Sequence, residues 1–135
     1  MILQTDNRLP AAINKYGCYL MSLLFIANKY TGYKLSTTVI SKLYMDFQER
    51  GYMDSNCYIQ DPAGILKHLG LKAIYNQRHD PPKYKCGKDE IELLCLQYSN
   101  YNHFVVGDGR GHIAYNPMGR TAPDYYFKSK RIFKI

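Results

Sequence analysis

The sequence predicts an α+β domain in which N-terminal helices pack on a C-terminal antiparallel β-sheet. Apolar residues recur at helical spacing between residues 18 and 70, and short apolar or alternating segments separated by turn residues follow. Because the helices come first and the strands afterwards, the two kinds of element should form separate layers. The chain has 135 residues, of which 46% are hydrophobic, so we expect one domain over residues 1–135 with its own core.

Three helices are expected in the first half of the chain, after an irregular or extended segment over residues 1–17. They cover residues 18 to about 30, 36 to about 51, and 61 to 70. The second helix has an N-cap region at Ser36, whose hydroxyl can accept a backbone N–H. The third begins at Asp61-Pro62, because Asp caps a helix and Pro suits its first position. Each of the three is followed by a glycine that can end it.

Five strands are expected after residue 70. The predicted segments are Leu71–Tyr75, Ile91–Tyr98, His103–Gly107, His112–Tyr115 and the tail Tyr125–Ile135. The run Gly107–Gly111 is typical of a hairpin turn, and Asp80-Pro81-Pro82 should break whatever precedes it. The tail alternates only loosely and is expected to add an edge strand.

The chain is basic, with 18 Lys and Arg against 11 Asp and Glu and a net charge of +7. This balance suggests an anionic partner such as nucleic acid, an acidic cell-wall polymer or a membrane surface. Cations concentrate in residues 83–88 and 128–134. In the second run they alternate with aromatic residues, which is one way to hold single-stranded nucleic acid. An edge strand whose lysines block sheet association explains that run at least as well, so nucleic acid is the weaker interpretation.

The expected cellular compartment and the expected lack of cofactors follow from motifs that the sequence does not contain. No segment approaches the ~18 apolar residues of a membrane span, and the N-terminus has no basic start or apolar stretch typical of a signal peptide. We therefore expect a cytoplasmic protein, which cell lysis would release. The four cysteines form no Cys-x-x-Cys pair and no zinc-finger spacing. Free thiols, no metal and no organic cofactor are expected.

Cys18 is the first candidate for chemistry, because it stands where the irregular segment becomes a buried helix. A thiol at a helix N-terminus lies at the positive end of the helix dipole, which should lower its pKa and favour the thiolate. The Cys18 N–H is also free to bind an oxyanion. The alternative is a small buried hydrophobic residue, a common role of cysteine. Cys86, in a lysine-rich segment without a matching histidine, is expected to be a surface cysteine.

His103 and Asn116 form the second candidate pair. If the hairpin loop has an even number of residues, Phe104 lies opposite Tyr115 and His103 lies directly opposite Asn116, with Cβ atoms about 5 Å apart. The amide would then orient the imidazole, as the third member of a Cys-His-Asn triad does. A loop with an odd number of residues would separate the two side chains onto opposite faces. A surface histidine beside an ordinary turn is the alternative.

Together these residues resemble the papain-like cysteine peptidase superfamily. The resemblance rests on Gln4, on Gly17-Cys18, on His103-Phe-Val-Val and on Asn116-Pro117. It is closest to the bacterial branch of bacteriocin-leader (double-glycine) peptidases. The resemblance implies a papain-like fold in which Cys18 is the nucleophile and His103 is the general base and then the acid. It also implies that Asn116 orients the imidazole and that Gln4 supplies an oxyanion donor.

Two departures from that branch leave alternatives open. Gln4 lies fourteen residues before the cysteine, more than in the leader peptidases, and the nearer Asn14 is a second candidate for the oxyanion donor. The third triad position is Asn, as in papain, where this branch more often has Asp. Tyr19, next to the nucleophile, and His112, near the hairpin turn, are candidate substrate-binding residues.

The function expected from this resemblance is a cysteine peptidase or amidase that hydrolyses a peptide or a cell-wall amide bond. Its substrate would be a peptide or a peptidoglycan-like polymer. Acyl transfer would use the same residues. The alternative is a catalytically inactive papain-like protein, phage-encoded or accessory, that binds an anionic or protein partner.

Overall fold

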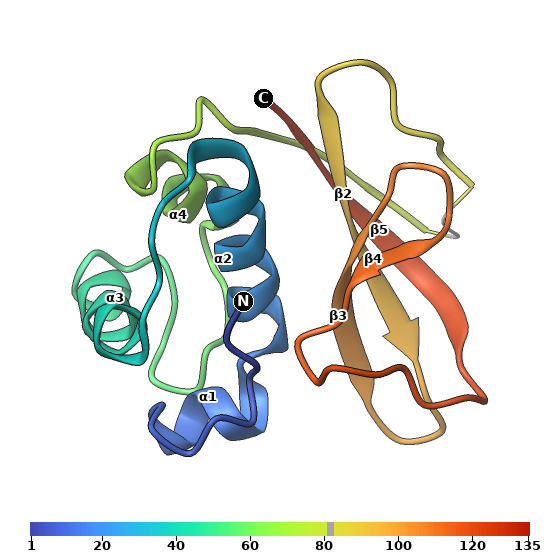
Figure 1. Ribbon diagram of the computed structural model, residues 1–135. Helices are drawn as coiled ribbons and strands as arrows, with labels where there is room; N and C mark the ends of the chain where they lie inside the picture. The colour runs from blue at the N-terminus through green and yellow to red at the C-terminus, as the bar shows by residue number, and fades with distance from the viewer. Residues whose placement is uncertain (81–82) are drawn as a thin grey trace.

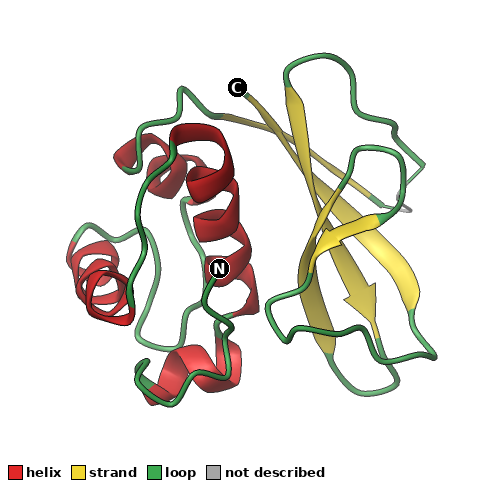
Figure 2. Cartoon of the chain, viewed as in Figure 1, coloured by secondary structure: helices red, strands yellow, loops and turns green. Residues whose placement is uncertain are grey.

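The computed structural model describes residues 1–80 and 83–135 as a layer of helices packed against one antiparallel sheet (Figures 1 and 2). This arrangement confirms the predicted α+β class and the order of its layers. The helices are α1 (Ala11–Tyr16), α2 (Cys18–Thr31), α3 (Thr37–Glu49) and α4 (Pro62–His68). The strands are β1 (Ile74–His79), β2 (Glu90–Gln97), β3 (Asn102–Gly107), β4 (Ile113–Tyr115) and β5 (Tyr126–Lys134).

The three predicted helices begin and end for local reasons. Ser36 Oγ accepts the Val39 N–H at 3.1 Å and caps α3. An Asp61 carboxylate oxygen accepts the Gly64 N–H at 2.9 Å and caps α4, which opens on a proline. Helix α2 ends at Gly32, whose φ of 70° lies in the left-handed region that favours glycine. These caps confirm the corresponding predictions.

The prediction of an irregular segment over residues 1–17 is wrong for its last third, where the chain forms α1. Pro10 supplies a fixed φ at the N-cap, and two alanines, the best helix formers, follow it. The helix has only six residues and buries only Ile13, so it gives no periodic apolar pattern. A helix this short depends on packing against the rest of the fold.

The sheet has the order β1-β5-β2-β3-β4, so the prediction that the tail forms an edge strand is also wrong. β5 pairs with β1 on one side and with β2 on the other. Ile132 and Phe133 within it are fully buried, as expected for an interior strand whose two faces are both covered. The edges of the sheet are β1 and β4.

The first predicted strand begins three residues later than expected, at Ile74 rather than Leu71. The Leu71 N–H donates to the Leu66 carbonyl at 3.0 Å, which makes this residue part of the helix terminus. β1 ends at His79, and the predicted break at Asp80-Pro81-Pro82 falls mostly outside the described residues, which omit residues 81 and 82.

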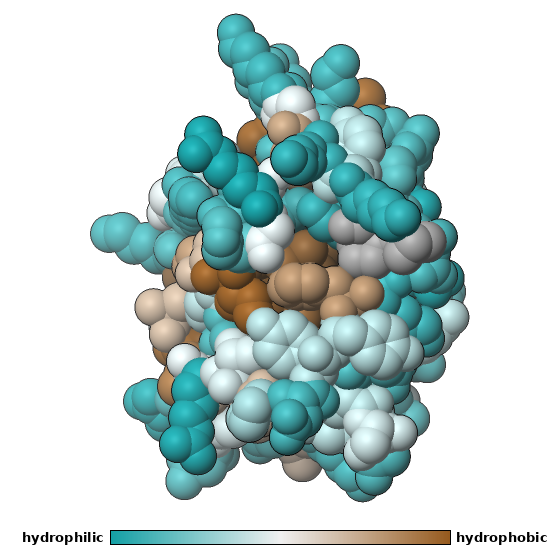
Figure 3. All heavy atoms as spheres, turned by 90° about the vertical axis from the view of Figure 1, so that its right-hand side faces the viewer, coloured by the Kyte–Doolittle hydropathy of each residue, from teal (hydrophilic) through white to brown (hydrophobic). Residues whose placement is uncertain are grey.

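The core lies between the two layers, with α2 at its centre. Seven residues of α2 are buried, and they pack against the helix-facing side of the sheet. A second, smaller cluster covers the outer side of the sheet and contains Leu94, Leu96, Tyr98 and Val105. Figure 3 views the molecule from that side and shows a hydrophobic area surrounded by hydrophilic side chains. The helices in the described part of the chain are too short or too polar to cross a bilayer.

Candidate active site

A break between α1 and α2 positions Cys18. Gly17 separates the two helices, and a Cβ at this position would lie 2.6 Å from the Ile13 carbonyl oxygen, so only glycine fits. The first hydrogen bond of α2 runs from the Met21 N–H to the Gly17 carbonyl at 2.8 Å. The Cys18 N–H has no backbone acceptor within the described ranges. The half-buried Cys18 therefore stands at the first residue of α2 with an uncommitted N–H beside it.

The structure brings His103 and Asn116 into direct contact. His103 Nε2 lies 2.7 Å from Asn116 Oδ1, and both side chains are buried. The predicted register of β3 and β4 is wrong in detail, because Val106, rather than Phe104, pairs with Tyr115. The register then shifts again between Val106 and Gly107. A shift of two residues keeps every side chain on its face of the sheet. Asn116 therefore lies diagonal to His103 rather than directly opposite, still within reach of the ring.

The hydrogen bonds of Asn116 fix which atom of its amide faces the imidazole. Its Nδ2 donates to the Arg120 carbonyl and to Thr121 Oγ1, each at 3.1 Å. Its Oδ1 accepts the Met118 N–H at 2.9 Å. Oδ1 is therefore the atom facing His103, and an oxygen of this kind can only accept. His103 Nε2 must donate, which leaves Nδ1 as the unprotonated, basic nitrogen of the neutral ring.

Two cavities meet at Cys18. The smaller, of about 340 Å³, is lined by Gln4, Cys18, His103 and Asn116 among others. The larger, of about 870 Å³, is lined by Cys18 together with residues of α2, of the sheet and of the segment between α3 and α4. Cys18 and Asn102 border both. Both cavities are bordered by the first residues of α2 and β3, two elements that begin at the lower side of Figure 1. The four residues that the sequence singled out as catalytic thus surround one cavity.

The hydrogen bonds near the N-terminus decide between Gln4 and Asn14. Asn14 Nδ2 donates to the carbonyls of Gln4 and Asp6, at 2.7 and 2.9 Å, so both of its N–H groups are used. Gln4 Nε2 donates once, to the Asn14 carbonyl at 3.2 Å, which leaves one N–H. Gln4 Oε1 is buried without a partner in the described structure. Asn14 therefore holds the segment that carries Gln4, and Gln4 is the amide left to bind a ligand.

Burial controls the protonation of both reactive groups. It raises the pKa of the Cys18 thiol, and backbone hydrogen bonding to Phe104 and Tyr19 offsets this only in part. Burial also lowers the pKa of His103, against the smaller opposite effect of its hydrogen bond to Asn116. The expectation of a lowered Cys18 pKa at the helix N-terminus is wrong, because desolvation by burial is the largest influence on this thiol and raises its pKa. Burial thus favours the neutral form of both groups, a thiol and an imidazole.

The two predicted substrate-binding residues lie in different places. Tyr19 lines the larger cavity, and its ring packs against Phe104 with centroids 4.4 Å apart. His112 lies at the hairpin turn, where its ring is paired with Asp108 at 3.3 Å and is 80% exposed. It borders neither of the cavities at Cys18, so the structure does not bring it to the site.

Sequence reasoning missed Arg131, which lines the larger cavity from β5. The sequence placed Arg131 only in the basic tail, where a positive charge is expected to lie on the surface. Across residues 1–80 and 83–135, no cluster of three His, Cys, Asp or Glu side chains is arranged to hold a metal ion. No hydrogen bond joins the Cys18 thiol to the His103 ring in these same ranges. Catalytic hydrogen bonds of this kind are commonly long before a substrate binds.

Fold and site together define an α+β protein that carries a cysteine, a histidine, an asparagine and a glutamine around one cavity. The chain belongs to the family described as "Protein of unknown function, DUF261", whose family model matches residues 1–135. No curated protein and no solved structure matches the chain.

Proposed function

We propose that the chain is a papain-like cysteine hydrolase that cleaves a peptide or cell-wall amide bond. The observation that carries this proposal is the 2.7 Å bond between His103 Nε2 and Asn116 Oδ1 beside the cavity that Cys18 lines. It leaves His103 Nδ1 as a base, fixed in orientation by an amide whose own direction is fixed. A thiol, an oriented base and spare N–H donors at one cavity are the parts that nucleophilic acyl chemistry needs.

The first half of the reaction forms a thioester. His103 Nδ1 takes the thiol proton as Cys18 Sγ attacks the carbonyl carbon of the substrate. The Cys18 N–H and the free N–H of Gln4 Nε2 stabilise the resulting oxyanion. When the tetrahedral intermediate collapses, the C–N bond breaks and His103 gives its proton to the departing amine. Because burial raises the pKa of the Cys18 thiol, this proton transfer accompanies the attack in each turnover.

The second half hydrolyses the thioester. His103 Nδ1 removes a proton from a water molecule, which attacks the thioester carbon. The C–S bond then breaks, the carboxylic acid product leaves, and the proton returns to the sulfur. The two cavities on either side of Cys18 provide separate places for the acyl and amine portions of the substrate.

A matched pair of variants tests the proposal. The protein is incubated with a proteome-derived peptide mixture and, separately, with purified peptidoglycan, and new termini are identified by mass spectrometry. We expect cleavage by the natural sequence and by Cys86→Ala, and loss of cleavage in Cys18→Ala. Cleavage that persists in Cys18→Ala would sink the proposal.

A second candidate is a catalytically inactive papain-like protein that binds an anionic or protein partner. The observation that favours it is the raised pKa of Cys18, because few thiolates form at neutral pH. This candidate predicts no new termini from any substrate and the same partner binding by the natural sequence and Cys18→Ala. Substrate-dependent acylation of Cys18, seen as an added mass in acid-quenched samples, would exclude it.

A further inference from the structure

Arg131 lies half-buried in the wall of the larger cavity that Cys18 also lines. Its guanidinium donates to Ser129 Oγ at 2.7 Å and lies over the Phe104 ring, 5.2 Å from the centroid. Its positive charge also opposes the burial that raises the pKa of Tyr19. These contacts hold the planar group in one orientation and leave several of its five N–H donors free.

Arg131 has no ion-pair partner among the residues described. Arg78 pairs with it across β1 and β5, so a second cation points to the same face of the sheet. Arg78 has Asp80 beside it at 3.6 Å. Like charges on directly opposite residues are unfavourable, and an anion bound at Arg131 would relieve this.

The larger cavity also has carboxylates, on its opposite wall between α3 and α4. An Asp54 oxygen accepts the N–H groups of Asn56 and Tyr58, at 2.8 and 3.0 Å. Asp61 caps α4 through Gly64. These two carboxylates therefore hold their own loops in place, and neither is paired with the guanidinium. The wall nearest Tyr19 and Phe104 thus presents an oriented, unpaired cation to whatever occupies the cavity.

We propose that Arg131 is the specificity residue of this cavity and that it binds a carboxylate of the substrate. The substrate would be a peptide or amide with an acidic side chain, or a free carboxylate, on one side of the bond that is cleaved. A guanidinium binds a carboxylate through two parallel N–H donors, which gives both orientation and selectivity. This inference rests on the proposed function, because it assigns a substrate class to the same site.

Two measurements test whether Arg131 binds a carboxylate of the substrate. The first is the rate at which peptidyl chloromethyl ketones modify Cys18, with Glu, Gln or Lys placed in turn at each position before the ketone. The second is the binding of fluorescent, unreactive alanine-based peptides, with the same three residues at each position, to Cys18→Ala. Arg131→Gln and Arg131→Lys are compared with Arg78→Gln, a neighbouring arginine outside the cavity lining.

We expect Glu to be preferred over its isostere Gln by about tenfold at one position, because a charge-assisted hydrogen bond is gained. The preference should disappear in Arg131→Gln, shrink in Arg131→Lys and persist in Arg78→Gln. Equal rates and affinities for Glu and Gln in the natural sequence, or a preference for Lys, would overturn the inference even if Arg131→Gln fails to fold. If no ketone modifies Cys18 but Cys18→Ala still prefers the acidic peptide, the hydrolase proposal fails and the carboxylate site stands.

Discussion

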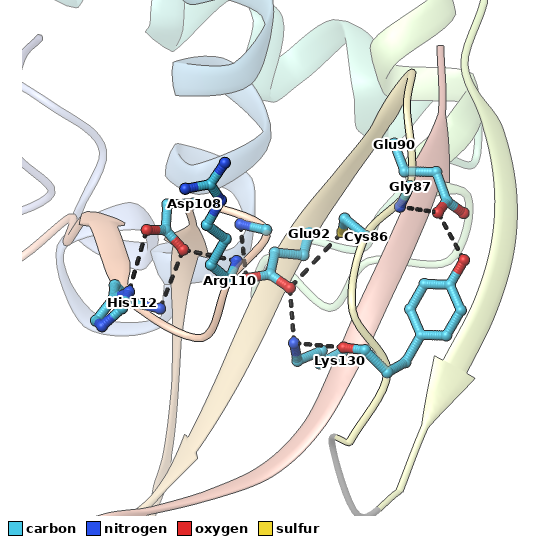
Figure 4. A network of polar contacts seen from close by, with 10 residues as sticks. Cys86, Gly87, Glu90, Glu92, Asp108, Arg110, His112 and Lys130 are labelled. Atoms are coloured by element: carbon cyan, nitrogen blue, oxygen red, sulfur yellow. Dashed lines mark hydrogen bonds and ion pairs between the residues drawn. The ribbon is translucent and has the colours of Figure 1, made fainter.

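Two regions of the molecule place a cysteine among polar groups, and they differ in what surrounds the sulfur. Cys18 opens α2 and borders two cavities together with His103. Cys86 lies at the other end of the sheet, in the segment before β2, where its thiol donates to a Glu92 oxygen at 3.7 Å (Figure 4). Both thiols have a pKa raised mainly by burial, and that of Cys86 reaches about 12. The pKa of the thiol therefore does not distinguish the two regions.

What distinguishes them is whether the acceptor atoms of the neighbouring group are already engaged in hydrogen bonds. Glu92 is fully buried and already holds Lys130 Nζ at 2.8 Å and the Gly109 N–H at 2.9 Å. Its charge further raises the pKa of Cys86. His103, by contrast, has no hydrogen bond at Nδ1 within residues 1–80 and 83–135. The expectation that Cys86 is a surface cysteine is only partly right, because its thiol is half-buried and faces a carboxylate rather than the lysines of its own segment.

The contrast also changes the interpretation of the basic tail. Lys130 is only 4% exposed, and it donates to the Tyr84 carbonyl at 2.7 Å as well as to Glu92. Lys130 and Arg131 are neighbours in β5, so these two cations of the tail point to opposite faces of the sheet.

The largest expected effect is on catalysis in the region around Cys18 and His103. His103→Ala should lower the rate of cleavage of a peptide that the natural sequence hydrolyses by about 10³-fold, because the base and acid are lost. The matched change Cys86→Ser should leave the rate within about twofold. Steady-state kinetics on both variants provide the measurement. Equal losses in the two variants would remove the functional distinction between the two cysteines.

The next largest effect is on the unfolding free energy and comes from the region around Cys86 and Glu92. Lys130→Met leaves the Glu92 carboxylate buried without its cation and should cost about 3 kcal/mol of unfolding free energy. Urea denaturation followed by circular dichroism measures this loss. The control is Lys128→Met, two residues away on the same strand, which should change stability by less than about 0.5 kcal/mol. A Lys130→Met protein as stable as the control would mean that the ion pair contributes nothing net.

A smaller effect is expected at the residue that positions the base. Asn116→Ala should lower kcat by about 30-fold, roughly 2 kcal/mol, with KM unchanged, because the imidazole loses its orientation and not its substrate. Asn116→Asp keeps an oxygen facing His103 Nε2 and should retain more activity. A rise in KM with no change in kcat would assign Asn116 to substrate binding instead.

The smallest effect is the pH dependence of stability due to His103. Its pKa in the folded protein is lowered from 6.5, mainly by burial. Between the two values the unfolded chain binds a proton that the folded protein does not, so stability falls as the pH drops through this range. Unfolding free energies measured between about pH 7.5 and pH 5 should therefore decrease less in His103→Gln than in the natural sequence. Parallel curves for the two proteins would contradict the lowered pKa.

Sequence reasoning succeeded where the determinants are local. The caps at Ser36 and Asp61 and the end of α2 at Gly32 each depend on a few neighbouring residues. The face shared by His103 and Asn116 follows from the two-residue period of a strand, so it was predictable even though the register was not. Helix α1 escaped prediction because its short sequence gives no periodic pattern.

The features that could not be predicted from the sequence depend on contacts between residues far apart in the chain. Nothing near β5 indicates that two other strands will flank it. The burial that raises the pKa of Cys18 comes from packing of α2 against β3, and it is invisible in the sequence around the cysteine. The choice of Gln4 over Asn14 likewise needed the hydrogen bonds of the folded N-terminal segment.

The central position of β5 has a consequence for the order in which the protein is made. β5 leaves the ribosome after every other strand, yet β1 has no other partner in the described sheet. Because β1 and β2 are joined only through β5 in the described sheet, the sheet cannot close before β5 has left the ribosome. Arg131 reaches its cavity at the same late stage. Any activity that depends on this cavity therefore begins only after β5 has taken its place in the sheet.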